Sequence, residues 1–496
     1  MRLAFLALSC ALFSALAPRG LAAEALPLPL SVGDCVRRAL DGNLEISIQR
    51  INPLIDEEAI RAARGDFDPA LVFTPNYEEN NTPLDAQSAV AAGGRLVTKS
   101  RTDSWSGGLQ GKVPLGTTYN FGLRTTDARN TFNSFSQQYT TYWGLELVQP
   151  LLRGFGPNSQ MAPIRIARVA RNISDEEFIW RVMDVLTRVH EAYFNLVYAI
   201  ENRKVQIQAL ELAAKLLEDN RKRVEIGVMA PIEITQAESG VAGREESVIL
   251  ADQDVSQRTT SLRALISPNA SDFEDRPLTP TDRPGDAPPP PKTRGEYLSE
   301  ALEMRPDYRA AKLAVERQNI QLVYDQQQRW PQLDLKGTAG FNGVDSHFAK
   351  TVDAKNERWS VGMAVRIPLP DQAAQGRLET SRLRKQQAIL QLKQAEQAVF
   401  VEVSNALDGM EACYKRIRAT RVARRAAEEA LAAETSKLRA GTSTSFVVLE
   451  LQNKLAEARS REIRALADYS IATSKLQQAM GTILRANNVE LARAAR

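Results

Sequence analysis

Residues 373–440 contain no proline and are rich in Ala, Leu, Glu, Gln, Lys and Arg, which are residue types that favour helices. At 1.5 Å per residue, a helix over this range is roughly 100 Å long. A helix of that length cannot be packed inside one globular domain, so other long helices have to cover its apolar positions. The chain is therefore predicted to form a coiled-coil-like assembly.

A strand pattern directly precedes this helix. In the stretch WSVGMAVRI, residues 359–367, every second residue is apolar and the alternate positions are small or polar. Period-2 alternation of this kind predicts a strand with one apolar face. Pro368 follows, and proline ends a strand because it fixes φ and lacks the amide donor. The sequence thus predicts a short strand that leads through Pro368 into a very long helix.

The chain contains two copies of this arrangement. The stretch DFDPALVFTP, around residue 69, aligns with QRWPQLDLKG 262 positions later, and LELVQPLL aligns with MAVRIPLP 218 positions later. The turns around Gly227 and Gly441 lie 214 positions apart. Such self-similarity indicates a duplicated structural unit. Each copy is predicted to run helix, strand, strand, very long helix, glycine-containing turn and long helix.

The two repeats are predicted to cover residues 30–270 and 296–482, followed by a C-terminal tail at 483–496. Residues 271–295 join the repeats, and their many prolines favour extended, solvated chain, so this segment is predicted to be a linker. The first repeat is 44 residues longer between its two strands. Alternating residues within this insertion predict a further hairpin at about residues 104–126.

Residues 1–23 predict a secretory signal peptide, since Arg2 precedes an apolar run and small residues lie near Ala22 and Ala23. The apolar run is too short for a membrane anchor, which needs about 20 residues. Lipidation at Cys10 is disfavoured because too little apolar sequence precedes it. No later segment is apolar over about 18 residues, so a part that crosses a membrane has to be a β-barrel.

The composition argues against an enzyme and against a nucleic-acid-binding protein. Lys and Arg number 63 against 60 Asp and Glu, so no strong field is expected to attract nucleic acid. The two histidines and three cysteines lack metal-ligand spacing, and no phosphate loop or nucleophile motif is present. A hydrolase that uses paired carboxylates needs one carboxyl group as the acid and another as the base, and no cluster in the sequence singles out such a pair. No catalytic residue, metal site or cofactor is predicted.

The sequence resembles the TolC-like family of outer-membrane efflux and secretion channels over about residues 30–482. The resemblance rests on the order and duplication of five stretches, which are QPLLRGFG at 149–156, VEIGVMAPIEITQAE at 224–238, RPDYRAAKLAVE at 305–316, VRIPLPD at 365–371 and LRAGTSTSFVVLELQ at 438–452. It implies a mainly α fold with β structure, in which two repeats of long coiled-coil helices carry strands. Those strands are expected to form a shared trimeric outer-membrane β-barrel that continues into a periplasmic α-helical tunnel.

The resemblance also implies a location and partners. The protein is expected to be a homotrimer in the Gram-negative cell envelope, in contact with outer-membrane lipid and without nucleic acid. A periplasmic adaptor (membrane fusion) protein and an inner-membrane transporter are its expected partners. The extra hairpin is expected either within the barrel wall or as an extracellular extension.

The resemblance implies the function of a channel in a tripartite efflux pump or a type I secretion system. The sequence does not separate drug, metal and protein cargo, because the tunnel conducts what its partners deliver. An exported structural coiled-coil protein of the cell envelope without channel activity is the alternative. That alternative leaves the duplicated strand pairs and their prolines unexplained.

By resemblance, both glycine-centred turns lie at the periplasmic tip, where the tunnel closes. Gly227 and Gly441 suit the position after a helix that needs φ > 0. The expected gate residues around them are Arg223, Glu233, Glu238, Arg439 and Glu450. The arginines are expected to offset the carboxylates by bridging neighbouring helices. The simpler interpretation is that these carboxylates are solvated helix starts stabilised by the helix dipole.

Three further expectations concern single residues. Val447 aligns with Glu233, so the acidic pattern is broken in the second repeat. Pro150 and Pro368 are expected to be strand-to-helix elbows, because proline suits both the end of a strand and a first helical turn. Cys35 and Cys413 are expected to be free thiols, although export permits a bridge between them.

Overall fold

The computed structural model describes residues 28–131, 134–269, 278–282, 288, 292–353 and 356–491. The predicted signal peptide, Cys10 and most of the predicted linker lie outside the described residues. The chain forms two compact units, one from residues 1–43, 186–289 and 410–474, the other from 44–185, 290–409 and 475–496. Each unit therefore draws on both sequence repeats.

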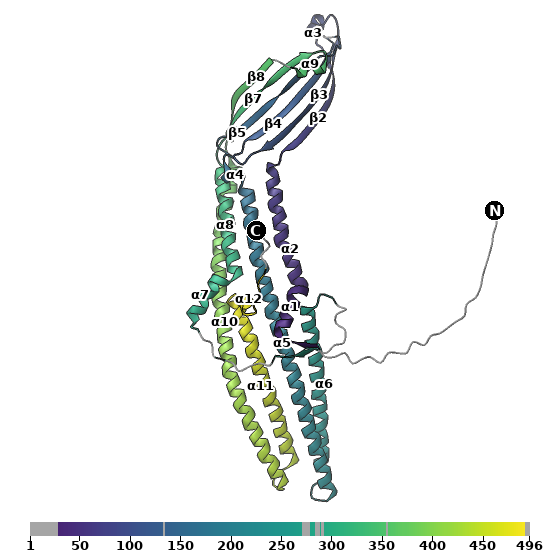
Figure 1. Ribbon diagram of the computed structural model, residues 1–496, viewed down its shortest axis with the longest axis vertical. Coiled ribbons are helices and arrows are strands. Elements are labelled where there is room, and N and C mark those ends of the chain that lie inside the picture. Colours follow the sequence, from purple (N-terminus) through teal and green to yellow (C-terminus); the bar gives the residue numbers. More distant parts are fainter. Residues whose placement is uncertain are drawn as a thin grey trace, which may run out of the picture. The chain divides into compact units, whose positions relative to one another are not determined.

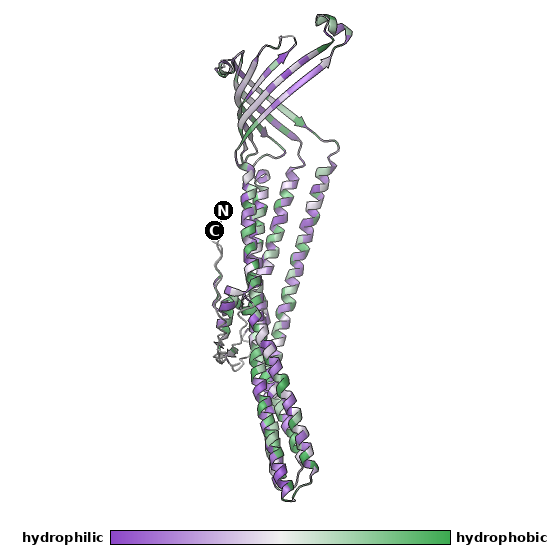
Figure 2. Ribbon diagram, turned by 90° about the vertical axis from the view of Figure 1, so that its right-hand side faces the viewer, coloured by the Kyte–Doolittle hydropathy of each residue, from purple (hydrophilic) through white to green (hydrophobic). Residues whose placement is uncertain are grey.

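The two longest helices pass through both units. They are α5 (Ala162–Glu225) and α10 (Gln372–Arg439), which has 68 residues and confirms the helix predicted for residues 373–440. Figure 1 shows each as one continuous ribbon. Apolar and polar residues are interleaved along both helices (Figure 2), so each offers apolar positions to its neighbours.

The first unit is helical, with α1 (Val32–Gly42), α6 (Ile232–Ile266) and α11 (Ser445–Ala479, up to residue 474) beside the long helices. Two clusters of its apolar core lie at contacts between helices. One cluster joins Leu216, Leu438 and Val448 from three helices, and another joins Val205, Ala209 and Ala456. Distributed contacts of this kind are typical of long, laterally packed helices.

Part of the predicted linker is ordered in the first unit. Strand β6 (Leu278–Pro280) pairs in parallel with β1 (Leu28–Leu30). The Asp282 carboxylate accepts hydrogen bonds from the Val32 amide (2.6 Å) and the Tyr193 hydroxyl (3.1 Å), and burial raises the pKa of Tyr193 to about 12. Residues 278–280 are extended as predicted, but Leu278 is buried, so the prediction of solvated chain is wrong at this residue.

The second unit contains a six-stranded antiparallel sheet with the order β2-β3-β4-β5-β7-β8 (Figure 1). The strands are β2 (Ala70–Pro83), β3 (Val97–Lys112), β4 (Thr118–Asn130), β5 (Tyr139–Pro150), β7 (Gln332–Asp345) and β8 (Asn356–Arg366). The predicted extra hairpin is β3–β4, longer than expected, and it lies inside the sheet between β2 and β5. Short helices α3 (Ala86–Ala91) and α9 (Phe348–Val352) lie in the loops.

Helices α2 (Leu44–Arg64), α7 (Arg294–Met304) and α8 (Pro306–Gln327) also belong to the second unit, with the short elements η1 (Gly65–Phe67), α4 (Pro157–Gln160) and α12 (Ile483–Ala486). A cluster of Ala162, Val169 and Ile320 packs α5 against α8. Helix α8 directly precedes β7 and confirms the helix predicted before the first strand of the second copy. It begins with Pro306, whose missing amide costs nothing in a first turn.

Arg305, just before α8, is the largest fully buried side chain among the described residues. Its guanidinium pairs with Asp307 and Glu402, each at 2.6 Å, and donates to the Ala479 carbonyl at 3.2 Å. The face of Trp180 lies 4.9 Å from the Arg305 guanidinium carbon. A planar guanidinium has enough donors for all these acceptors, so one side chain joins α5, α8, α10 and the end of α11.

We expect Arg305→Met to lower the free energy of unfolding by about 3 kcal/mol, because the Ala479 carbonyl and both carboxylates lose a charged donor. The matched control is Arg294→Met, which removes an exposed pair with Asp408 and should cost less than about 1 kcal/mol. Thermal unfolding in detergent measures both. Equal midpoints for the two variants would contradict the role given to Arg305.

Candidate functional site

The two glycine-centred turns have the same backbone geometry. After α5, the Gly227 amide bonds the Val224 carbonyl (3.0 Å) and the Val228 amide bonds the Arg223 carbonyl (3.0 Å). After α10, the Gly441 amide bonds Leu438 (3.2 Å) and the Thr442 amide bonds Lys437 (3.0 Å). Gly227 has φ +77° and Gly441 has φ +79°. These are Schellman caps, in which glycine takes the left-handed conformation that other residues adopt at a cost.

Three side chains tie the two turns together. The buried Asn220 amide donates to the Ser445 hydroxyl (2.8 Å) and to the Glu233 carbonyl (3.3 Å). The Glu233 carboxylate accepts from the Ser445 amide (3.3 Å), which is the first residue of α11. Arg223 donates to the Leu438 carbonyl (3.0 Å) in the last turn of α10. Glu233 and Arg223 thus complement the charges at a helix N-terminus and a helix C-terminus, respectively.

The other expected gate residues make local contacts. Glu238 pairs with Arg221 (2.7 Å) and Glu450 with Lys454 on its own helix (2.6 Å). For Arg439, the described part of the chain shows no ion pair or hydrogen bond. The expectation that the two arginines offset carboxylates is therefore wrong within one chain. Arg223 bonds a carbonyl, because the last turn of α10 leaves carbonyls without helical partners.

The second turn is held by contacts of Glu434 that the sequence did not predict. The Ser443 hydroxyl donates to Glu434 (2.6 Å), and Lys437 lies 3.0 Å from the same carboxylate. These contacts hold the pKa of Glu434 below its usual range. Glu434 lies seven residues before Gly441, as Asn220 lies seven before Gly227. The aligned polar residues at these two positions were the signal that would have found both.

Gly441→Ala should destabilise its turn by about 1–2 kcal/mol, because a Cβ is unfavourable at φ +79°. Hydrogen exchange should then be about 5–30-fold faster for the amides that follow residue 441. Gly409→Ala is the matched control, since this α10 glycine has open space around it and alanine favours a helix. Unchanged exchange in Gly441→Ala would show that the turn does not need the left-handed conformation.

The two predicted elbow prolines end strands but do not begin helices. Pro150 is the last residue of β5, and the first-turn proline of the next helix is Pro157 in α4. Pro368 follows β8, and α10 is capped by Asp371, whose carboxylate accepts from the Ala374 amide at 3.1 Å. The expected place of both prolines in a first helical turn is therefore wrong, because a loop separates each from its helix.

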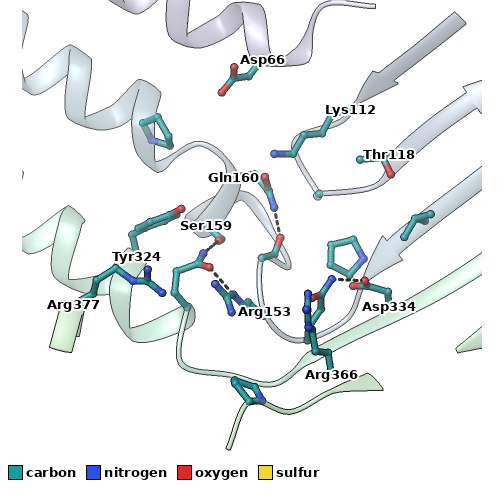
Figure 3. A pocket seen from close by; sticks show the side chains of 18 of the residues that line it. Asp66, Lys112, Thr118, Arg153, Ser159, Gln160, Tyr324, Asp334, Arg366 and Arg377 are labelled. Carbon is teal, nitrogen blue, oxygen red and sulfur yellow. Dashed lines mark hydrogen bonds between the residues drawn. The ribbon is translucent and has the colours of Figure 1, made fainter. Parts of the chain in front are cut away.

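A cavity of about 810 Å³ lies beside these elbows, between the ends of the strands and the neighbouring helices of the second unit (Figure 3). Arg153 donates to Gln328 (3.0 Å), which donates to Ser159 (3.3 Å), so the loop after β5 is fixed to α8 and α4. Charged residues of both signs line the cavity, namely Asp66, Lys112, Arg153, Asp334, Arg366, Asp371 and Arg377. Such a lining favours water over an apolar ligand.

The sheet has one apolar and one polar face. The strand register aligns one row across all six strands on the apolar face, which is Leu71, Leu109, Phe121, Leu145, Ala339 and Trp359. Trp359 and Leu71 are 75% and 84% exposed, although both are large and apolar. On the polar face, the same strands carry residues such as Asn120, Glu146 and Thr338. A large exposed apolar surface of this kind marks contact with protein or lipid.

The described residues contain no group of His, Cys, Asp and Glu that would hold a metal ion. Cys35 is buried and free, and burial raises its pKa to about 12. Cys413 is also free, with a pKa raised by burial, so the expected free thiols are confirmed.

Within the described ranges, no helix combines the length and apolar character needed to cross a membrane.

Comparison with known proteins gives consistent matches. The sequence profile of the family described as "Outer membrane efflux protein" matches residues 36–267 and 297–482. Outer membrane protein TolC of Vibrio cholerae is 23% identical over 62% of this chain and 70% of its own length. Fusaric acid resistance protein FusA of Burkholderia cepacia is 27% identical, but the match spans only 36% of this chain and 34% of FusA.

The fold is also similar to solved structures. The Campylobacter jejuni CmeC outer membrane channel matches with a TM-score of 0.67 and 15% identity, over 91% of this chain and 86% of CmeC.

Proposed function

The chain belongs to the outer membrane efflux protein family, and on this premise we propose that it is the outer-membrane channel of a tripartite efflux pump or a type I secretion system. The predicted resemblance to TolC-like channels is confirmed by this membership. So is the prediction that the chain is not an enzyme, because its relatives are channel proteins. The cargo, the partners and the oligomeric state are the proposed part.

The observation that carries the proposal is that the second unit has two open sides. Strands β2 and β8 are the sheet edges, and each pairs on one side only. Helix α2 leads into β2, and it exposes the apolar stripe Leu44, Ile48, Ile51 and Ile55. Helix α10 follows β8, and it exposes Leu383, Leu390, Phe400 and Val401. Unpaired strands and apolar stripes on both sides favour a ring of copies.

The strand directions fit such a ring. With six antiparallel strands, β2 and β8 run in opposite directions, so β2 of one copy continues the antiparallel order beside β8 of the next. We take the ring to be a homotrimer whose strands close into one outer-membrane barrel. Closure satisfies the backbone groups of both edges, which a membrane requires.

The apolar face of the sheet suits lipid. On β7 it extends from Leu333 to Phe341, which is about 26 Å along the strand and about 20 Å in height at a tilt of about 40°. Trp105 and Tyr139 lie beyond one end of this band, and both pack against Phe348 of α9. Aromatic residues at the border of an apolar band are typical of membrane barrels.

The glycine-centred turns form the closed end of the channel in this proposal. Three copies bring together six turns, so Glu233 and Glu450 each recur three times around one axis. Carboxylate rings attract cations and repel one another, and a docking adaptor protein displaces the contacts that hold them. The inner-membrane transporter then supplies the cargo. The hydrogen bonds between the turns are few, and they lie beside the apolar cluster of Leu216, Leu438 and Val448.

The proposed assembly is tested by the mass of the purified protein in detergent. We expect three chains and a native β-sheet content. Cysteines placed at β2 and β8 should cross-link different chains, whereas the same pair within one chain is separated by four strands. A stable monomer with full β content, or cross-links confined to one chain, would contradict the proposed assembly.

Loss of the ties between the turns should open the channel. Asn220→Ala and Glu233→Ala each remove a link between α5 or α6 and the start of α11, so we expect several-fold higher conductance in planar bilayers. Glu218→Gln is the control, because its partner Lys222 lies on the same helix and both side chains are 66% exposed. Equal conductance in all three variants would place the gate elsewhere.

A further inference from the structure

The proposed channel does not by itself require the hairpin β3–β4 within the sheet. It separates β2 from β5, with 14 register pairs to β2 on one side and 10 to β5 on the other. Its faces continue the pattern of the other strands. Leu109 and Phe121 share the apolar face with Leu145, whereas Gln110 and Asn120 share the polar face with Glu146. The hairpin is therefore built like the strands on either side of it.

A row of glycines crosses the hairpin and its neighbours on the polar face. Gly108, Gly122, Gly144 and Gly340 face one another in register across β3, β4, β5 and β7. A Cβ on Gly108 would lie 2.9 Å from the Cα of Gly122, and one on Gly144 would lie 2.7 Å from the Cα of Gly340. No side chain fits at either place without separating the strands.

Such a row is what a tightly curled sheet needs. On the concave face of a curled sheet the side chains crowd, and glycine removes that crowding. The side chain of Tyr142 fills the space, since a Cβ on Gly144 would lie 2.7 Å from its hydroxyl oxygen and one on Gly340 would lie 2.9 Å from its ring. The guanidinium carbon of Arg358 lies 5.6 Å from the centroid of this ring. The polar face is thus the concave one, and the line of strongest curvature passes through both hairpin strands.

We infer that the hairpin β3–β4 is part of the membrane wall and that three copies close with 18 strands, curled along the glycine row. This rests on the proposed trimeric channel. The hairpin then supplies one third of the wall and of its inner lining. Without the hairpin, each copy would contribute four strands and the wall would have 12.

The difference in width is large. With strands about 4.8 Å apart and tilted by about 40°, an 18-stranded wall has a backbone radius of about 18 Å, against about 12 Å for 12 strands. The cross-section at the backbone is therefore more than doubled. The hairpin residues that line this exit are small or neutral, apart from Lys112 and Arg124, and include Ser104, Ser106, Gln110, Asn120 and Thr126. A wide exit does not select cargo by size, so selection by size belongs to the opposite end of the channel.

The test places a fluorophore on single cysteines in the channel with Cys35→Ser and Cys413→Ser, reconstituted in vesicles of brominated lipid. Leu109→Cys and Phe121→Cys should be quenched at least several-fold more than Gln110→Cys and Asn120→Cys. Leu145→Cys and Glu146→Cys on β5 are the reference pair. Quenching of Leu145→Cys with none at the four hairpin positions would overturn the inference alone. No quenching at any position would overturn the proposed function together with it.

Two further measurements make the test independent of labelling. Electron cryomicroscopy of the trimer in lipid nanodiscs should show 18 strands, and 12 strands with the hairpin above the membrane would refute the inference. Gly144→Ala should lower the yield of trimer at least several-fold, whereas Gly337→Ala should leave it unchanged, because Gly337 lies on the apolar face of β7 with open space around it. Equal yields would remove the role given to the glycine row.

Discussion

The unpaired backbone groups of β2 and β8 are the constraint on which the rest of this structure depends. A sheet edge exposes amides and carbonyls in a row, and in lipid each unsatisfied group costs several kcal/mol. Both edges belong to elements that continue into long helices with exposed apolar stripes. In the proposed ring, the same neighbour that pairs with a strand edge also covers a helix stripe, so strands and helices are completed together.

Much of this architecture was predictable from local patterns. The prolines, the period-2 stretches and the duplicated glycine turns depend on short-range backbone chemistry, which a sequence shows directly. The long helix was predicted to within one residue at each end, since nothing in residues 373–440 interrupts it.

The contacts between distant segments were not predictable in this way. Asn220 looks like an ordinary exposed helix residue until Ser445, 225 positions later, is placed against it. The order in the linker has the same origin, because Leu278 and Asp282 have partners near residue 30. Both predicted prolines end their strands, but neither lies in a first helical turn, and Asp371 rather than Pro368 caps α10. In the sheet, β2 to β5 pair in chain order, and it is the pairing of β5 with β7 that joins distant segments.

The even number of strands in each copy bears on how such walls evolve. An inserted hairpin adds one ascending and one descending strand, so the direction of the final strand relative to the first does not change. The contact surface between copies can then stay as it was while the circumference grows. A single added strand would instead set neighbouring copies in conflict. Duplication or loss of whole hairpins is thus a route by which related proteins can change exit diameter without redesigning their subunit interface.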